Sequence, residues 1–129
     1  MSTVVSQIVV GCAGSSHRDA AQYHHRWFVV DAKGSLLSAT QSPGLKEVIT
    51  DIRMGYLVLR APGMLRMDIP MDVIEDDDSV RKTATVGDQT VDVVDEGEVA
   101  AVWFSHVTGQ PSRLMKVHPE AKPVAWPAS

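Results

Sequence analysis

Short apolar runs separated by turn-forming residues make up most of this chain. Strict alternation with polar residues, as in Leu65, Met67 and Ile69, is typical of a half-buried strand. Other runs are continuously apolar and rich in β-branched residues, which also favours strands. The pattern predicts eight or nine short strands, at residues 4–10, 27–30, 36–40, 45–53, 56–60, 65–69, 79–86, 89–94 and 113–117.

One of these segments, residues 45–53, carries two patterns. The alternation of Val48, Thr50 and Ile52 indicates a strand, whereas Leu45 and Val48 also fit a helical turn. A glycine-containing turn follows and leads directly into the next apolar run. The strand is therefore the favoured interpretation.

A single helix is expected late in the chain, beginning at Asp95. Asp95 followed by Glu98 matches the acidic form of a capping box. Gly109 stands where a left-handed C-terminal cap belongs. Helical spacing predicts one apolar stripe, formed by Val99, Val102, Trp103 and Val107.

Many short strands joined by tight turns are typical of a small β-barrel. The expected fold is therefore mainly β, a closed or nearly closed barrel of about eight or nine short strands with one helix near the C-terminus. A two-sheet sandwich is the alternative. The barrel domain is expected to span residues 1–118. Residues 119–129 contain Pro119, Pro123 and Pro127 and are expected to form a Pro-rich extended tail.

Composition is that of one soluble domain. The 129 residues are 44% hydrophobic and 22% charged, and no apolar run approaches the roughly 20 residues needed to span a membrane. With 12 basic and 16 acidic residues and no basic block, the chain lacks the positive footprint that nucleic acid binding needs. We therefore expect a cytoplasmic protein with neither nucleic acid nor membrane as a partner.

The single cysteine, Cys12, narrows the possible chemistry. It excludes an internal disulfide and every structural zinc site that needs two cysteines. Because Cys12 adjoins an apolar run, we expect its side chain to be buried and to pack as a small hydrophobic residue. The histidines lack metal-ligand spacing, so no metal site is expected. The acidic run 75–78 lacks the spacing of a calcium loop and is interpreted as a solvated turn.

Two segments hold the candidate ligand-binding residues. Ser15 and Ser16 lie in a glycine- and serine-rich loop whose amides could cradle an anion, although the loop lacks the ending of a P-loop. His24, His25 and Arg26 precede an apolar strand, and Arg26 is the best cation for an anionic ligand. On a strand the two histidines would point to opposite faces, one packed and one in solvent. The simpler interpretations are that the two serines lie in a flexible loop and that Arg26 is a solvent-facing strand residue.

Several motifs occur in an order that is found in a known family. They are His25-Arg26-Trp27-Phe28-Val29-Val30-Asp31 with Gly34 after it, Gln41-Ser42-Pro43, Ala61-Pro62-Gly63-Met64, the segment 95–105, and Gly109-Gln110-Pro111-Ser112-Arg113-Leu114. Together, over residues 4–120, they resemble the MOSC N-terminal β-barrel domain family.

The resemblance implies a β-barrel module that is usually fused to a MOSC domain, in proteins that handle molybdenum cofactor or its sulfur. The functional cysteine of those proteins belongs to the MOSC domain, and Cys12 does not correspond to it. Cofactor-binding members have basic groups where this chain has Gly14, Thr40 and the His24-His25 pair. Without those cations the charge-assisted bonds to a cofactor phosphate are lost. No cofactor is therefore expected in the isolated chain, and molybdenum cofactor is implied by the resemblance only.

Two functions fit these observations. The first is a non-enzymatic accessory or binding module that acts with a possible separate MOSC-domain protein, because the catalytic MOSC half and its cysteine are absent. The alternative is a stand-alone binder of small anions or pterin-type ligands. Its binding residues would be Ser15, Ser16, His24, His25 and Arg26. An enzyme with a histidine base is least favoured, because no nucleophile, base and orienting residue form a visible set.

Overall fold

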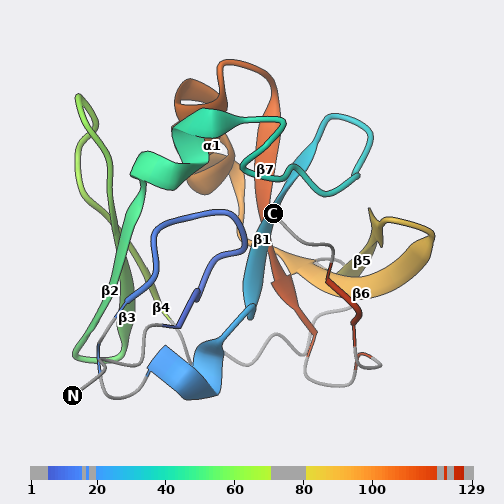
Figure 1. Ribbon diagram of the computed structural model, residues 1–129, viewed down its shortest axis with the longest axis horizontal. Coiled ribbons are helices and arrows are strands. Elements are labelled where there is room, and N and C mark those ends of the chain that lie inside the picture. The colour runs from blue at the N-terminus through green and yellow to red at the C-terminus, as the bar shows by residue number, and fades with distance from the viewer. Residues whose placement is uncertain are drawn as a thin grey trace.

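The computed structural model describes residues 6–15, 17, 20–70, 81–118, 121 and 124–126. Within these ranges the chain forms seven strands, one α-helix and two short 3-10 helices (Figure 1). The expected mainly-β fold with one helix near the C-terminus is confirmed. The expected turn at residues 75–78 lies outside the described residues.

Four antiparallel strands form the larger sheet, in the order β1-β7-β6-β5. Their bounds are Trp27–Asp31 (β1), Arg81–Val86 (β5), Gln89–Asp95 (β6) and Ser112–Val117 (β7). The expected hairpin between β5 and β6 is confirmed, since Val86 pairs with Gln89 across a two-residue turn. In Figure 1 this sheet runs from the centre of the molecule to its right side and curls strongly.

The second sheet has the order β2-β3-β4, with bounds Ile49–Arg53, Tyr56–Arg60 and Met67–Pro70. Arg53 pairs with Tyr56, so a two-residue turn joins β2 to β3. Both turn residues, Met54 and Gly55, have positive φ (50° and 83°), as a tight hairpin turn requires. In β4 buried and exposed residues alternate as the sequence pattern predicts.

Two of the expected strands do not form strands in their described residues. In the described part of 4–10, Ser6 and Val9 make isolated bridges to Ser15 and Trp27. In the expected strand 36–40, Leu36 makes one isolated bridge, to Val30. The structure therefore has two separate sheets and a few isolated bridges, with seven strands among the described residues where eight or nine were expected.

The ambiguous segment 45–53 divides between the two patterns. Its first residues belong to the 3-10 helix η2 (Pro43–Glu47), and β2 begins at Ile49. Pro43 occupies the first turn of η2, where its fixed φ suits a helix and its missing N–H is not needed. The strand interpretation is thus wrong for residues 45–48.

The helix α1 (Glu98–Thr108) begins three residues later than expected. Its N-cap residue is Gly97, which makes no side-chain capping bond, so the predicted capping box is wrong. Asp95 instead ends β6, and its Oδ1 accepts the Gly97 N–H at 2.8 Å. The predicted cap at Gly109 is confirmed, with φ 76°.

The buried face of α1 differs from the predicted stripe. Ala100, Ala101, Trp103 and Phe104 are buried. Val99 and Val102 are 79% and 57% exposed, so the predicted stripe does not coincide with the buried face at these two positions. The helix packs against β7 and η2, and this contact rather than apolar character alone selects the buried face.

Two apolar clusters form the core. β1 contributes to both, because its alternate residues point to opposite sides: Trp27 and Val29 to the first cluster, Phe28 and Val30 to the second. The first cluster also contains residues of the second sheet and of α1. The second is covered by Ala121, Val124 and Trp126, which we call the C-terminal segment together with Ala125.

The C-terminal segment is held by its backbone as well. The Gln89 side chain donates to the Ala125 carbonyl at 2.7 Å and accepts the Ala125 N–H at 3.0 Å. The predicted boundary between a domain and a tail after His118 stays a prediction. No helix in the described ranges is long and apolar enough to cross a membrane.

Candidate functional site

His24 and His25 lie in the turn between the 3-10 helix η1 (Ala20–Tyr23) and β1. They are not on a strand, so the prediction that they point to opposite faces is wrong. Their rings stack, with centroids 3.8 Å apart and planes 23° apart. The turn requires a positive φ of 55° at His25, which brings the two side chains to the same side.

Gln7 connects this histidine pair to the first described segment. Its backbone N–H donates to His24 Nδ1 at 3.0 Å, and its carbonyl accepts the His25 N–H at 2.7 Å. Its side chain donates from Nε2 to the Cys12 carbonyl at 3.0 Å, which leaves Oε1 facing His25 Nε2 at 3.2 Å. The sequence pattern did not indicate this role for Gln7; the available signal was a polar residue interrupting the apolar run 4–10.

These contacts determine where the imidazole protons lie. An amide oxygen can only accept a hydrogen bond, so His25 Nε2 must donate to Gln7 Oε1. His24 Nδ1 accepts from an N–H and is therefore unprotonated in this arrangement. Burial, and secondarily the charge of His24, lowers the pKa of His25 from its ordinary value of 6.5. The observed hydrogen bonds therefore need an unprotonated Nδ1 on His24, and burial disfavours the charged form of His25.

Ser15 lies at a different place from the histidines. It is buried, forms an antiparallel bridge with Ser6, and its Oγ accepts the His17 N–H at 3.1 Å. It lines a polar cavity of about 450 Å³, whose other walls are Gly14, His17, Ile49, Thr50, Asp51, Val58 and Arg60. Ser16 lies outside the described residues.

Arg26 is half-buried and does not line this cavity. Its backbone N–H donates to the Tyr23 carbonyl, and its own carbonyl accepts the Val117 N–H. His24 and His25 do not line the cavity either. Among the candidates that the structure describes, the histidines therefore meet at Gln7, whereas Ser15 belongs to a separate hollow.

The cavity beside Ser15 does not fit a pyranopterin phosphate. Its walls offer one guanidinium, that of Arg60, and the imidazole of His17, while the Asp51 carboxylate opposes an anion. Gly14, where the family resemblance implies a cation in cofactor-binding members, lines the cavity without one. A phosphate that is held by fixed, charge-assisted bonds needs more positive charge than these walls supply.

An apolar groove of about 750 Å³ runs between α1 and the loop that connects β3 to β4. Leu65 is 88% exposed, and it lines this groove together with the exposed Val99 and Val102. Trp103 also lines it, and its indole donates to the Leu65 carbonyl at 2.8 Å. The sequence pattern placed these valines on one apolar stripe with Trp103 and therefore did not indicate the groove.

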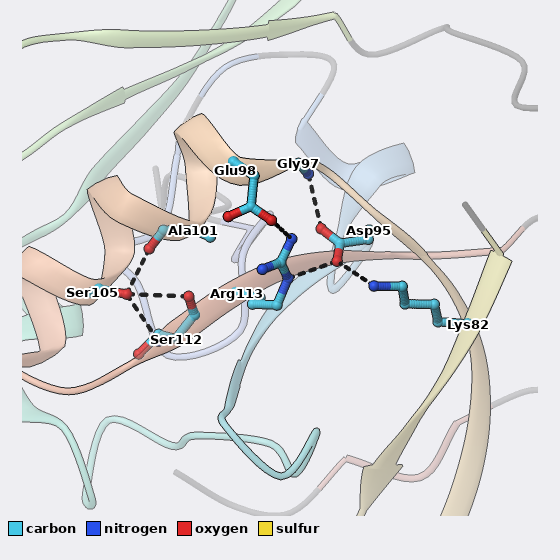
Figure 2. A network of polar contacts seen from close by, with 8 residues as sticks. All are labelled: Lys82, Asp95, Gly97, Glu98, Ala101, Ser105, Ser112 and Arg113. Atoms are coloured by element: carbon cyan, nitrogen blue, oxygen red, sulfur yellow. Dashed lines mark hydrogen bonds and ion pairs between the residues drawn. The ribbon is translucent and has the colours of Figure 1, made fainter. Parts of the chain in front are cut away.

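A cluster of four charged side chains joins α1 to the large sheet (Figure 2). The Asp95 side chain is 6% exposed, and its Oδ2 accepts from Arg113 Nε at 2.6 Å and Lys82 Nζ at 3.1 Å. Arg113 also donates to Glu98 Oε1 at 2.9 Å. Burial alone would raise the pKa of Asp95. Hydrogen bonds from Arg113, Gly97 and Lys82 outweigh it and leave that pKa below its ordinary 3.8.

The Ser105 hydroxyl continues this connection along the helix. Ser105 Oγ donates to the Ala101 carbonyl at 2.7 Å and accepts the Ser112 N–H at 2.9 Å (Figure 2). Because these charges and hydroxyls satisfy one another across α1 and β7, we interpret the network as a fastening of the helix.

Cys12 is 3% exposed, as expected for a small buried hydrophobe, and burial strongly raises the pKa of its thiol. A buried neutral thiol is a poor nucleophile. The described residues contain no group of three potential metal ligands among His, Cys, Asp and Glu.

Known proteins resemble this chain in sequence and in structure. Human molybdenum cofactor sulfurase is 30% identical over 96 residues, which are 73% of this chain and 11% of that protein. The chain thus spans about a tenth of that relative. A structural-genomics target from Bordetella bronchiseptica, whose solution structure is known, is 54% identical with a TM-score of 0.86. That match covers 99% of this chain and 98% of the other.

The family comparison covers most of the chain. The profile described as the MOSC N-terminal beta barrel domain matches residues 2–111. This range includes the second sheet and α1, and it ends one residue before β7. The ordered motifs, the mainly-β fold and this match agree, and the chain belongs to the MOSC N-terminal β-barrel domain family.

Proposed function

We propose that this chain is a non-enzymatic accessory module that docks on a separate MOSC-domain protein linked to molybdenum cofactor or sulfur transfer. The observation that carries the proposal is the apolar groove beside α1, with Leu65, Val99 and Val102 exposed together. Contiguous apolar side chains on the surface of a small domain are a feature of protein interaction sites.

The family relationship supports this choice of partner. In human molybdenum cofactor sulfurase, the matching segment is one part of a much longer chain. A domain that acts apart from such a chain needs a surface with which to bind it. The charges at the rim of the groove are already paired, Arg66 with Asp68 at 2.9 Å and Glu98 with Arg113 at 2.9 Å. The rim can therefore approach a partner without exposing an unpaired charge to it.

The proposed module carries out no catalytic step. Its single thiol is buried, and the histidine pair is engaged with Gln7. A reduced cysteine suits the cytoplasm, which is where the proposal places the module.

The test is a binding measurement with a purified MOSC-domain protein from the same genome. Titration calorimetry of the two chains should show a complex. The double variant Val99→Glu, Val102→Glu should weaken it at least about tenfold, because two carboxylates would be buried without partners. Met54→Glu is the matched control, since Met54 is 97% exposed and lies outside the groove. No complex, or equal affinity for all three chains, would overturn the proposal.

A second function is favoured by the cavity beside Ser15, where Arg60 and His17 form a wall suited to a single small anion. Inorganic phosphate is the probe. Chemical-shift titration should show binding at Ser15 and Thr50 that weakens when Arg60→Ala removes the guanidinium. Arg66→Ala is the control, because Arg66 does not line this cavity. An ordinary histidine changes charge between about pH 5 and pH 8. If phosphate does not bind at any pH in this range, this alternative is wrong.

A further inference from the structure

We propose that His24 and His25 form a proton-operated clasp that holds the C-terminal segment against the large sheet. In the closed form the uncharged pair is fixed by Gln7 and supports Trp126. Protonation of the pair opens the clasp and releases the segment. None of these residues lines the apolar groove, so the clasp does not depend on the proposed function.

The first support is the contact between the pair and Trp126. The Trp126 ring lies edge-on to His25, with centroids 5.4 Å apart, and edge-on to Phe28 at 5.2 Å. Phe28 is fully buried in the second core cluster. Trp126 therefore bridges the histidine pair and the core, and the position of His25 determines whether the indole keeps both contacts.

The second support is that the observed hydrogen bonds require uncharged imidazole at His24. Its Nδ1 accepts the Gln7 N–H, and a protonated Nδ1 can only donate. Protonation would replace this bond with two hydrogens facing each other. Since Gln7 also holds His25 through its side chain and its carbonyl, loss of the bond disturbs both members of the pair.

Among the described residues, the side chains that contact the pair, those of Gln7 and Trp126, carry no charge that would stabilise an added proton. Residues 6–15, and the described residues 121 and 124–126 of the C-terminal segment, carry no charged side chains. Of the ionisable neighbours in sequence or register, Tyr23 is neutral, Arg26 is positive, and Lys116, which pairs with Trp27, is also positive. His118 follows β7, and the Glu96 carboxylate is engaged by the Trp27 indole at 3.0 Å.

These contacts fix the direction of the pH effect. Stacking at 3.8 Å makes a second positive charge unfavourable, and burial of His25 adds to this. A lowered pKa means that the open form binds protons more readily than the closed form. The clasp is therefore closed above the ordinary value of 6.5 and opens as the pH falls through the lowered pKa.

The test is an NMR titration of the intact chain from about pH 8 to pH 5, across the ordinary histidine range. The indole N–H signal of Trp126 should move, with a midpoint that coincides with titration of the His24 and His25 ring signals. The Ala125 N–H should lose hydrogen-exchange protection. If the open form binds one more proton than the closed form, this protection should fall by up to about tenfold for each unit by which the pH is lowered. The indole of Trp103 should stay constant, because its partner is the Leu65 carbonyl.

The double variant His24→Gln, His25→Asn removes both titrating groups, and asparagine tolerates the positive φ at position 25. In it the Trp126 signal should be independent of pH. His106→Gln on α1 is the matched control and should keep the parent response. A Trp126 signal that does not move in the parent chain would overturn the clasp. So would a gain of Ala125 protection at low pH, which would mean that an imidazolium–indole attraction fastens the segment instead.

Discussion

Asp95 shows how one side chain can connect three elements. It ends β6, its carboxylate is almost fully buried, and it accepts from Arg113 on β7, from Lys82 on β5 and from the Gly97 N–H before α1. Removing one member of a buried charge cluster leaves the others unpaired, which destabilises more than the pair itself contributes. Asp95 therefore ties the start of α1 to the large sheet.

We expect Asp95→Asn to lower the free energy of unfolding by about 2 kcal/mol at neutral pH, because Arg113 and Lys82 lose their counterion. Urea unfolding measures this loss. The pKa of Asp95 is lowered, so its contribution is present above 3.8 and is lost as the pH falls through the folded value. The difference between the two chains should then shrink near pH 3.

Asp68→Asn is the control for this change. Asp68 pairs with Arg66, but both side chains are substantially exposed, at 34% and 51%. An exposed pair contributes less than about 1 kcal/mol. A loss at Asp68 equal to that at Asp95 would show that burial of Asp95 has no special importance.

Cys12 gives a second prediction at this scale. Because burial raises the pKa of its thiol, the native chain should react with an aromatic disulfide reagent far more slowly than the chain in concentrated urea. Absorbance of the released thiolate measures the rate. Fast stoichiometric labelling of the native chain would contradict the buried position.

At the scale of elements, α1 is positioned by η2 as well as by β7. Gly44 in η2 lies very close to the backbone of α1. A Cβ added there would be 2.5 Å from the Val107 carbonyl oxygen. Because the nearest atoms of α1 belong to the backbone, no flexible side chain could move to make room for the Cβ. Glycine is thus needed at this position for its missing side chain.

Gly44→Ala should lower the free energy of unfolding by about 2 kcal/mol, as is usual for overpacking. Thermal and urea unfolding provide the measurement. Lys46→Ala in the same 3-10 helix is the control, because Lys46 is exposed. If Gly44→Ala were as stable as the control, α1 and η2 would have to be farther apart than described.

At the scale of the whole molecule, the large sheet has apolar clusters on both of its faces. The first includes Leu57 and Leu59 of β3 and Phe104 of α1, and the second is covered by the C-terminal segment. Since β1 and β7 contribute to both clusters, disruption of either one affects the same strands. We therefore expect the described elements to unfold as one unit.

Trp126→Ala tests this coupling. It should lower the free energy of unfolding by about 2 kcal/mol, because it removes two aromatic contacts and uncovers Phe28. Circular dichroism and the signal of Trp103 should still report one common midpoint. Leu65→Ala, at an 88% exposed position, is the control and should change stability little. Separate midpoints in the parent chain would refute a single cooperative unit.

Local signals in the sequence determined much of the secondary structure. Alternation predicted β4, the glycine turn predicted the β5–β6 hairpin, and Gly109 predicted the end of α1, because each depends on backbone conformation and side-chain period over a few residues. Ordered motifs also indicated the family, which the match to residues 2–111 confirms.

Only the tertiary structure decided which face of each element is buried and which polar groups meet. Val99 and Val102 fit the helical stripe, yet packing of α1 on β7 and η2 leaves them in solvent. Gln7, His25 and Trp126 are far apart in the chain, and a local pattern carries no information about such contacts. Burial and hydrogen-bond partners depend on the arrangement of whole elements, so the groove and the contacts of the histidine pair arise only in the folded chain.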